Sequence, residues 1–468
     1  MTVLEKKWQV PTQIATEIFR AYDIRGIVDQ ALTEDSVYAV GLAFGSQAQT
    51  VGQSHVAVGR DGRLSSPRLS QALIQGLLDS GCNVVDIGCV PSPILYFATN
   101  TLATQSGIMV TGSHNPADYN GLKMVLAGQT LAEIQIQQLR QRIEQLEFTQ
   151  GNGSVIECDV TSDYLDCIVK DVQLAKPLKI VIDCGNGIAG AMTPALFRRL
   201  GCDVIELFCE VDGRFPNHHP DPTIAENLQA LQQKVLETNA DIGLAFDGDA
   251  DRLGVITDQA EIIWPDRQMI VFAEDVLSRN PGQTIVFDVK CTQHLAQRIT
   301  AAGGKPLMYK TGHSLLKRKM QEVQAPLAGE MSGHIFFKER WYGFDDGLYS
   351  AARLLEIVSQ HPGRVSDLFA TIPDSVNTPE LKIPIAEAQK QTFMRQLIEQ
   401  GDFQAEQLNT IDGLRVEYAN GWGLIRPSNT TPCLVLRFEA DSQAALQQIQ
   451  AIFKREIGRC DGELAIGF

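Results

Sequence analysis

Short apolar runs that end in polar turns recur along the chain, and a helix-like stretch often follows them. Four runs of this kind occupy residues 55–63, 179–187, 241–252 and 284–292. Because continuous apolar strands that alternate with helices are typical of buried sheets, this pattern predicts α/β units with mostly parallel strands. Ligands of such sheets collect beyond the carboxyl ends of the strands. Those ends carry Arg, Asp, Asn and Lys here, so we expect the chemistry there.

The pattern changes near the C-terminus. It predicts a helix, a strand, a Gly-Trp-Gly turn, a second strand and a second helix, at residues 387–400, 413–418, 421–423, 433–438 and 441–457. This order is typical of an α+β module and differs from the preceding α/β units.

Three segments mark changes between parts of the chain. Residues 148–157 form a polar link after a long Gln-rich helix, residues 257–266 look like a hairpin, and residues 375–384 resemble another linker. At ~150 residues per domain, length alone suggests about three domains. Three α/β units together with the different C-terminal module make four domains. We therefore expect the following domains: 1–157, 158–260, 261–374 and 375–468.

Composition and charge narrow the class of protein. Hydrophobic residues make up 44% and charged residues 21%, which is ordinary for a globular chain. The net charge is 40 − 56 = −16, so nucleic acid and anionic membranes are poor partners. An anionic small molecule can still bind where Lys and Arg cluster locally. No apolar run approaches the ~20 residues of a membrane helix, and the N-terminus lacks the apolar region of a secretory signal. We expect a cytoplasmic protein.

The chain has 10 cysteines and no C-x-x-C pair. Several of them, such as Cys209 and Cys433, lie in apolar stretches. We interpret the set as buried, reduced thiols rather than as disulfides or zinc ligands.

The sharpest local motif is the sequence DGDADR at residues 247–252, directly after the apolar run IGLAF. Asp247, Asp249 and Asp251 would repel one another without a cation, and their hard oxygen donors suit Mg²⁺ or Ca²⁺. An EF-hand fits badly, because Arg252 and Asp258 stand where that loop needs Gly and Glu. The alternative is an acidic, solvated turn, and we favour a metal site.

Three further loops are weaker signals when each is taken alone. Ser113 in TGSHNP (111–116) lies on a turn at a strand end, but the motif G-x-S-x-G is absent and an ordinary turn is the favoured interpretation. RPSNTTP (426–432) could cradle a phosphate or could be a Pro-bounded hairpin turn. GEMSGH (329–334) could hold a sugar, although a solvated loop is the simpler interpretation.

One motif points to a different class of enzyme. GNGIAG (185–190) matches G-x-G-x-x-G after a strand, with Asp203 and Glu206 downstream, which is the pattern of a dinucleotide site. Asp183 and Asn186, however, would crowd the place of the pyrophosphate. A nicotinamide-dependent oxidoreductase is therefore the rival hypothesis.

Taken together and in this order, the loops resemble those of the α-D-phosphohexomutase family. FRAYDIRG (19–26) looks like the entry segment of that family, and TGSHNP, DGDADR, GEMSGH and RPSNTTP match its phosphoserine, metal, sugar and phosphate loops. KTGHSLLK (310–317) is similar to its bacterial bifunctional phosphomannomutase/phosphoglucomutase subgroup. Phosphoglucosamine mutases are similar and remain an alternative.

The resemblance implies a fold and a reaction. Three related mixed α/β domains and a C-terminal α+β domain would surround a central active-site cleft. The enzyme would be an isomerase that interconverts hexose 1-phosphate and hexose 6-phosphate of mannose and glucose. A phosphoserine enzyme and a hexose 1,6-bisphosphate intermediate would carry the phosphate. A sugar-phosphate sensor without activity is disfavoured, because every residue of catalytic type is present.

The resemblance also implies roles for residues of this chain. The expected catalytic residues are Ser113, His114, Lys123, His334, Arg252 and Arg20. The expected substrate-binding residues are Tyr22, Lys290, His313, Glu330, Ser332, Arg426, Ser428, Asn429 and Thr430. The expected metal ligands are Ser113, Asp247, Asp249 and Asp251, for one Mg²⁺ per chain. Glucose 1,6-bisphosphate is expected as activator and intermediate, phosphosugars as the small-molecule partners, and a monomer or weak oligomer as the assembly.

Overall fold

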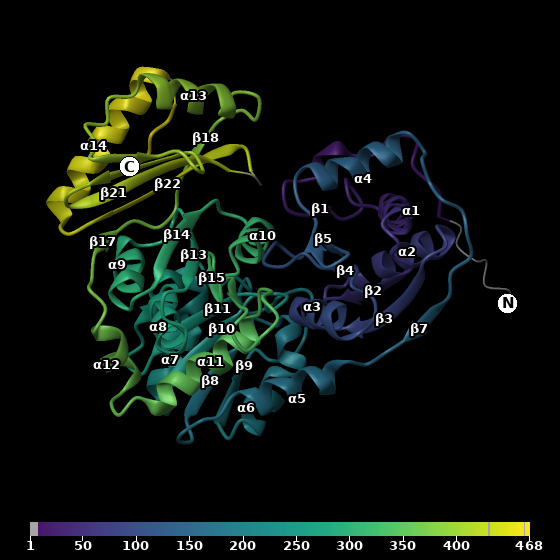
Figure 1. Cartoon of the computed structure of the whole chain (residues 1–468), viewed down its shortest axis with the longest axis horizontal. Coiled ribbons are helices and arrows are strands. Elements are labelled where there is room, and N and C mark those ends of the chain that lie inside the picture. Colours follow the sequence, from purple (N-terminus) through teal and green to yellow (C-terminus); the bar gives the residue numbers. More distant parts are fainter. Residues whose placement is uncertain (1–7, 429–430, 463) are drawn as a thin grey trace. The chain divides into compact units, whose positions relative to one another are not determined.

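The computed structural model describes residues 8–428, 431–462 and 464–468. The chain folds into two compact units (Figure 1). Unit 1 runs to residue 265 and also includes residues 332–369, and unit 2 comprises residues 266–331 and 370–468.

The first sheet of unit 1 is mixed, with its strands in the order β1-β5-β4-β2-β3-β7 and β6 beside β5. The strands are β1 (Ile24–Ile27), β2 (His55–Arg60), β3 (Asn83–Cys89), β4 (Gly107–Val110), β5 (Tyr119–Leu126), β6 (Gln129–Thr130) and β7 (Val155–Glu157). β2, β3, β4 and β7 are parallel, whereas β5 runs antiparallel to β1 and β4. The segment 148–157, expected as a link alone, therefore ends in a strand that pairs with β3.

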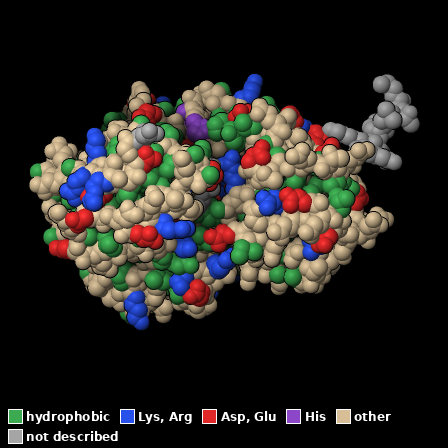
Figure 2. All heavy atoms as spheres, turned by 90° about the horizontal axis from the view of Figure 1, so that it is seen from above, with side chains coloured by type: hydrophobic (Ala, Val, Ile, Leu, Met, Phe, Trp, Pro, Cys, Tyr) green, Lys and Arg blue, Asp and Glu red, His purple; other side chains and the backbone are tan. Residues whose placement is uncertain are grey.

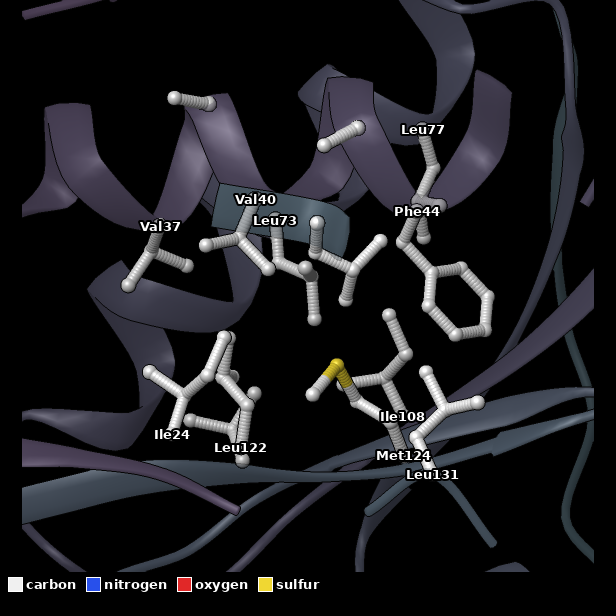
Figure 3. Close-up of a cluster of buried hydrophobic side chains, with 14 of the residues drawn as sticks. Ile24, Val37, Val40, Phe44, Leu73, Leu77, Ile108, Leu122, Met124 and Leu131 are labelled. Atoms are coloured by element: carbon white, nitrogen blue, oxygen red, sulfur yellow. The ribbon is translucent and has the colours of Figure 1, made fainter. Parts of the chain in front are cut away.

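Four helices of this part of unit 1 bury their apolar faces in one core. They are η1 (Thr16–Ile18), α1 (Glu34–Thr50), α2 (Ser66–Asp79) and α4 (Ile134–Glu144). A further helix, α3 (Ser92–Thr101), contacts β2 and β4 outside this core. α1 starts at a reciprocal cap in which Thr33 and Ser36 exchange hydrogen bonds. α1 and α2 lie close together because Gly41 and Gly76 face each other, and a Cβ on Gly41 would meet the Gly76 Cα at 3.1 Å. Figure 3 shows side chains of α1, α2 and the sheet in this core.

The second sheet of unit 1 has the order β12-β11-β10-β8-β9. Its strands are β8 (Lys179–Asp183), β9 (Asp203–Leu207), β10 (Ile242–Phe246), β11 (Leu253–Thr257) and β12 (Ile262–Ile263). β9, β8 and β10 are parallel, and β11 and β12 form the hairpin that the sequence predicts at 257–266. The other elements of unit 1 are α5 (Thr161–Asp171), η2 (Ile188–Ala191), α6 (Thr193–Arg199), η3 (Ala225–Leu228), α7 (Gln229–Thr238), β16 (Ile335–Phe337), α11 (Gly347–Gln360) and α12 (Val365–Ala370), which ends at the boundary.

Unit 2 contains a parallel α/β part. Strands β13 (Thr284–Asp288), β14 (Lys305–Tyr309) and β15 (Leu327–Gly329) pair in the order β14-β13-β15. The helices are α8 (Pro265–Arg279), α9 (Gln293–Ala301) and α10 (His313–Val323).

The C-terminal part of unit 2 is an antiparallel sheet with helices α13 (Lys390–Gln400) and α14 (Gln443–Cys460). Its strands are β17 (Val376–Asn377), β18 (Leu381–Pro384), β19 (Gln407–Asn409), β20 (Leu414–Tyr418), β21 (Gly421–Pro427) and β22 (Cys433–Ala440). The prediction of a Gly-Trp-Gly turn is wrong, because these residues begin β21. Trp422 is fully buried, and the Arg415 guanidinium carbon lies 3.7 Å from its ring centroid. Packing of the indole outweighs the local tendency of glycine to form turns.

The cysteines divide between buried and more accessible positions. All ten are free, but Cys89 is exposed and four others are half-buried. The expectation of buried thiols is therefore wrong for half of the set. Figure 2 shows acidic and basic side chains interspersed over the face that it presents. Within the described ranges, the helices lack the length or the hydropathy needed for a membrane crossing.

Candidate active site

Ser113 lies in the loop that follows β4. Its φ of 49° is in the left-handed region, and its side chain is buried in unit 1. The Ser113 backbone N–H donates to Thr111 Oγ1 at 2.9 Å. Asp61, at the end of β2, accepts from Thr111 Oγ1 at 2.8 Å and from the Gly112 N–H at 3.2 Å. The neighbouring strand end therefore holds this strained turn in place.

Arg63 binds the backbone of the serine loop through four hydrogen bonds. Its Nη2 donates to the carbonyl oxygens of Ser113 at 2.8 Å and Asn115 at 2.6 Å. Its Nη1 donates to those of Pro116 at 2.5 Å and Tyr119 at 2.9 Å. The guanidinium is 2% exposed and lies 3.3 Å from an oxygen of Asp61. One buried side chain therefore fixes both the loop and the strand that follows it.

The Asp-rich loop follows β10 in the same unit. Asp247, Asp249 and Asp251 are fully buried, and each offers an oxygen within 4.8 Å of the others. Asp247 Oδ1 accepts the backbone N–H groups of Asp251 at 3.1 Å and Arg252 at 3.2 Å, and Ala250 has a φ of 64°. The turn thus directs all three carboxylates to one point.

The two loops meet at their functional atoms. Ser113 Oγ donates to Asp247 Oδ2 at 3.0 Å. A Cβ on Gly248 would collide with the Ser113 carbonyl oxygen, so the close approach of the two backbones requires glycine. Ser92, at the start of α3, adds a second tie through its N–H, which donates to the Asp249 carbonyl oxygen at 3.0 Å.

Lys123 of β5 completes this group from the first sheet. Its Nζ donates to Asp249 Oδ2 at 2.6 Å and also to Asp251 Oδ2. Burial opposes the charge of Lys123, but Asp249 and Asp251 outweigh it and raise the pKa of the ammonium above its usual value. Asp249 and Asp251 therefore favour the charged form of Lys123.

The carboxylates of the loop differ in their electrostatic state. Burial raises the pKa of Asp247 well above its usual value, and the negative charges of Asp251 and Asp249 raise it further. Burial acts in the same direction on Asp251, but Lys123 and His334 overcome it and hold the pKa of that carboxyl well below its usual value. Carboxylates this close cannot all ionise at low cost without more positive charge.

The site residues fit a divalent cation. Asp249 Oδ1 is buried and has no hydrogen-bond partner among the described residues. Hard carboxylate oxygens in an anionic pocket are the donors that Mg²⁺ prefers. Asp247, Asp249 and Asp251 are the side chains that could hold it, with Ser113 Oγ beside Asp247.

Two histidines lie next to this group. His114 Nδ1 is 3.1 Å from Ser113 Oγ, and removal from water together with Arg252 and Arg25 lowers the pKa of this imidazole well below its usual value. His334 Nε2 lies 3.3 Å from Asp251 Oδ1 and 3.4 Å from Arg252 Nε. Ser332 Oγ lies 2.9 Å from His334 Nδ1, so Ser332 also belongs to this unit.

The other predicted residues of unit 1 lie before β1. Arg20 and Tyr22 are half-buried there, and Arg20 lines a pocket of about 590 Å³ with Phe19 and Gln137. Their predicted roles stay predictions.

Unit 2 holds the rest of the predicted substrate-binding residues. Lys290 Nζ is 2.7 Å from Glu380 Oε1, and Lys290 lowers the pKa of Glu380 to about 2. Glu330 is 2% exposed, and its Oε1 accepts the Gly312 N–H at 2.5 Å, at the start of α10. His313, the first residue of that helix, is also buried. The simple interpretation of Glu330 as a solvated loop carboxylate is therefore wrong.

Arg426 and Ser428 belong to the end of β21 and the turn after it. Arg426 Nε donates to Asp412 Oδ2 at 2.9 Å, and Ser428 Oγ lies 2.8 Å from Thr431 Oγ1. Asn429 and Thr430 lie outside the described residues. β21 and β22 are antiparallel neighbours, so Arg426 and Ser428 lie where β21 ends and the connection to β22 begins.

Three residues that support the site were missed by the sequence reasoning. Asp61 and Arg63 hold the serine loop, and Arg25 Nη1 donates to Asn115 Oδ1 in the same loop. A signal existed for each, because Asp61 and Arg63 end an apolar run and Arg25 belongs to FRAYDIRG.

The GNGIAG segment serves a different purpose from dinucleotide binding. The short 3₁₀ helix η2 follows it, and the Ile188 N–H donates to the Gly248 carbonyl oxygen at 3.2 Å. The Asn186 side chain donates to the Glu210 carbonyl oxygen at 2.8 Å. The segment packs against the Asp-rich loop, where a pyrophosphate would need open backbone N–H groups.

Comparison with known proteins identifies relatives over almost the whole chain. Family models described as phosphoglucomutase/phosphomannomutase match in succession: alpha/beta/alpha domain I at residues 16–150, domain II at 162–260, domain III at 264–376 and the C-terminal domain at 380–456. A phosphomannomutase/phosphoglucomutase of Pseudomonas putida is 56% identical over 459 residues, which cover 98% of this chain and 99% of the relative. A phosphoglucomutase of Neisseria gonorrhoeae is 52% identical over 450 residues, covering 95% and 97%. The crystal structure of a phosphoglucomutase/phosphomannomutase family protein from Burkholderia thailandensis has a TM-score of 0.94 at 51% identity, covering 97% of this chain and 100% of that one.

Proposed function

Because the chain belongs to the phosphoglucomutase/phosphomannomutase family, we propose that it interconverts the 1-phosphates and 6-phosphates of glucose and mannose. The observation that carries this proposal is the hydrogen bond of 3.0 Å between Ser113 Oγ and Asp247 Oδ2. It places a nucleophilic hydroxyl in contact with a buried carboxylate cluster that suits a cation. Such a pair fits a phosphoryl carrier beside the charge that stabilises transfer.

Ser113 carries the phosphoryl group between two half-reactions. In the first, a free hydroxyl of the sugar monophosphate attacks the phosphorus of phosphoserine, and the bond between phosphorus and Ser113 Oγ breaks. The product is a hexose 1,6-bisphosphate. In the second half-reaction, Ser113 Oγ attacks the other phosphate and releases the isomeric monophosphate. The covalent intermediate thus divides one difficult transfer into two.

Each transfer moves one proton from the attacking oxygen and one to the departing oxygen. His114 Nδ1, at 3.1 Å from Ser113 Oγ, is placed to give a proton to that atom or take one from it. Lys123 and His334 both contact Asp251 and are the candidates that serve the sugar hydroxyl. Arg252, beside His334, adds positive charge for the phosphate.

Asp247, Asp249 and Asp251 hold Mg²⁺ in this proposal, with Ser113 as a fourth ligand. When bound, Mg²⁺ supplies positive charge that offsets the charge of the transferring phosphoryl group. The protein then contributes fixed positions: Lys123 keeps Asp249 and Asp251 in place, and Arg63 keeps the Ser113 backbone in place. Preorganised charge of this kind is a large contribution to phosphoryl transfer.

The substrate class is a hexose phosphate. Lys290, Arg426 and Ser428 are proposed to bind phosphate, and Glu330 is proposed to bind hydroxyls of the sugar. Glucose and mannose differ only in the configuration at C2, so one enzyme accepts both if it contacts mainly O3 and O4. A phosphoglucosamine mutase, which would have to accept an amino group at C2, is the second candidate.

A coupled assay tests the proposal on the full chain. Glucose 1-phosphate, mannose 1-phosphate and glucosamine 1-phosphate are compared with and without glucose 1,6-bisphosphate, and intact mass records phosphate on Ser113. We expect turnover of the two hexoses, activation by the bisphosphate, and a phosphate adduct that Ser113→Ala lacks. Activity confined to glucosamine 1-phosphate, or a fully active sample without the adduct, would refute the proposal.

We also propose that the protein acts in the cytoplasm as a monomer or weak oligomer, without nucleic acid or membrane as a partner. The net charge of −16 supports the absence of these two partners, since a negatively charged protein is repelled by nucleic acid and by anionic membranes. Light scattering across a concentration series tests the assembly, and a stable dimer at the lowest concentration would contradict it.

A further inference from the structure

Two cysteines of unit 1 lie in contact where two neighbouring parallel strands end. Cys184 directly follows β8, and Cys209 follows the parallel neighbour β9, whose last residue Leu207 pairs with Asp183. The two sulfur atoms are 3.6 Å apart, within hydrogen-bonding distance for thiols. Cys184 is fully buried and Cys209 is half-buried, so an oxidant in solvent can meet Cys209 first.

The chain that leaves Cys184 runs directly to the Asp-rich loop. Gly187 packs so tightly that a Cβ there would lie 2.9 Å from the Gly248 carbonyl oxygen. The Ile188 N–H donates to that same oxygen at 3.2 Å. A shift at Cys184 is therefore transmitted to the loop that holds Asp247 and Asp249.

The chain that leaves Cys209 runs to the support of the serine loop. A Cβ on Gly213 would lie 2.7 Å from the Cα of Arg63. The Phe215 ring centroid lies 5.0 Å from the guanidinium carbon of the same arginine. Arg63 in turn binds the Ser113 carbonyl oxygen at 2.8 Å. The segments that follow the two cysteines therefore contact the Asp-rich loop and Arg63, the residue that supports the serine loop.

We propose that Cys184 and Cys209 are a modification site at which a peroxide forms a disulfide that slows phosphoryl transfer. The second half of this proposal rests on the proposed mutase function. The first half, formation of the disulfide, does not.

The chemistry balances with hydrogen peroxide as the oxidant. The Cys209 thiolate attacks one peroxide oxygen, the O–O bond breaks, and the departing hydroxide takes a proton to become water. This leaves a sulfenic acid on Cys209. The Cys184 sulfur then attacks the Cys209 sulfur, the S–O bond breaks, and hydroxide leaves with the Cys184 proton as a second water. Two thiols and one peroxide thus give one disulfide and two waters.

The order of the two steps follows from the surroundings of the sulfurs. The hydrogen bond with Cys209, together with burial, raises the pKa of the Cys184 thiol well above its usual value. Cys184 is therefore the poorer first nucleophile. Oxidation of Cys209 removes that hydrogen bond and leaves Cys184 next to an electrophilic sulfur.

Formation of the bond must change the geometry. The sulfur separation has to fall from 3.6 Å to about 2.05 Å. The backbones cannot follow freely, because the Asn186 N–H donates to the Phe208 carbonyl oxygen at 2.8 Å and its side chain donates to the Glu210 carbonyl oxygen at 2.8 Å. The displacement therefore passes into the connections to Gly248 and Arg63. A misplacement on the order of 1 Å in a phosphoryl-transfer site costs up to about a hundredfold in rate.

The experiment uses the full chain and three proteins: the native sequence, Cys209→Ser, and Cys158→Ser as the control. Cys158 is half-buried like Cys209 but has no contact with Cys184 among the described hydrogen bonds. Each protein is treated with hydrogen peroxide, its remaining thiols are alkylated, and its peptides are mapped. Hydrogen exchange of residues 111–116 and 247–252 gives a readout that is independent of turnover.

We expect a Cys184–Cys209 crosslink and faster exchange of both loops in the native protein and in Cys158→Ser, but not in Cys209→Ser. Mutase activity should fall roughly tenfold or more with the crosslink and return with a thiol reductant. Absence of the crosslink while Cys89 is oxidised would overturn the disulfide. An equal loss of activity in Cys209→Ser would overturn its effect on transfer. A crosslink in a protein without mutase activity would instead count against the proposed function alone.

Discussion

Replacement of Arg63 by methionine should loosen the serine loop without touching the phosphate or the cation. The arginine side chain donates to four carbonyl oxygens, of which those of Ser113 and Asn115 lie in the loop itself. It also neutralises the buried carboxylate of Asp61 at 3.3 Å. A methionine side chain would fill similar space but would remove both the charge and every hydrogen bond.

The loss of stability depends on which hydrogen bonds the former partners of Arg63 retain. Loss of one member of a buried ion pair costs about 3–5 kcal/mol. Asp61 still accepts from Thr111 Oγ1, the Gly112 N–H and Ser66 Oγ, and water can reach the carbonyl of the exposed Pro116. We therefore expect Arg63→Met to destabilise the serine loop by about 3 kcal/mol, the low end of this range. Arg63→Lys should cost about half as much, because it keeps the charge but donates at most three hydrogen bonds from one atom.

Hydrogen exchange of residues 107–121 measures this effect on the folded protein. About 3 kcal/mol corresponds to exchange that is roughly a hundredfold faster. kcat should fall at least about tenfold, since Ser113 would no longer be held at the carboxylates. Arg68→Met is the matched control, because its ion pair with Asp29 is exposed and should be worth about 0–1 kcal/mol. If Arg63→Met equalled Arg68→Met in both measurements, the supporting function of Arg63 would be refuted.

Four further outcomes test other parts of the protein. Asp249→Asn should weaken Mg²⁺ binding in calorimetry and abolish most of kcat while the circular dichroism spectrum is retained; full activity after exhaustive chelation would contradict a metal site. Arg426→Ala should raise KM for the monophosphate about 10- to 150-fold, because a charged hydrogen bond is worth ~1.5–3 kcal/mol, and unchanged kinetics would remove this residue from the site. Ionised Glu380 stabilises unit 2 at pH values above its usual pKa of about 4.5, and this contribution is lost as the pH falls towards its folded-state pKa of about 2. Glu380→Gln should therefore make the melting temperature less dependent on pH between these two values. An unchanged pH dependence of the melting temperature would show that Lys290 does not hold this charge. Glu330→Ala should lower kcat/KM for both sugars by a similar factor, which corresponds to a loss of about 2–4 kcal/mol in transition-state stabilisation. A lower kcat/KM for one epimer only would show that Glu330 contacts O2.

The sequence predicted individual loops well, because each loop follows an apolar strand within a few residues. The run SGIMV leads to Ser113 and IGLAF leads to Asp247, and both strands were placed correctly. The contact between these two residues spans 134 positions and depends on how two different sheets pack. No local pattern encodes that distance. Only the resemblance to a family placed the loops in one site.

Errors arose where tertiary packing overrode a local preference. The glycines around Trp422 favoured a turn, but burial of the indole against Arg415 makes them part of β21. Val155–Glu157 looked like a polar link, yet the edge of β3 offered it hydrogen-bond partners. Arg63 was not predicted as a supporting residue, because it binds backbone carbonyl groups, which every residue has.

The charge of the carboxylate cluster explains why Lys123 and a divalent cation can share it. Lys123 Nζ donates to the Oδ2 atoms of Asp249 and Asp251, whereas Asp249 Oδ1 is buried without a hydrogen bond among the described residues. Asp249 thus presents one oxygen to the ammonium and keeps the other for a metal, while Asp251 Oδ1 lies 3.3 Å from His334 Nε2. Three carboxylates against Lys123 and Arg252 leave an excess of one negative charge when all are ionised. Burial raises the pKa of Asp247, and the negative charges of Asp251 and Asp249 raise it further. A divalent ion would turn the excess into one positive charge beside Ser113, and an anionic phosphate is the group that such a site would then attract.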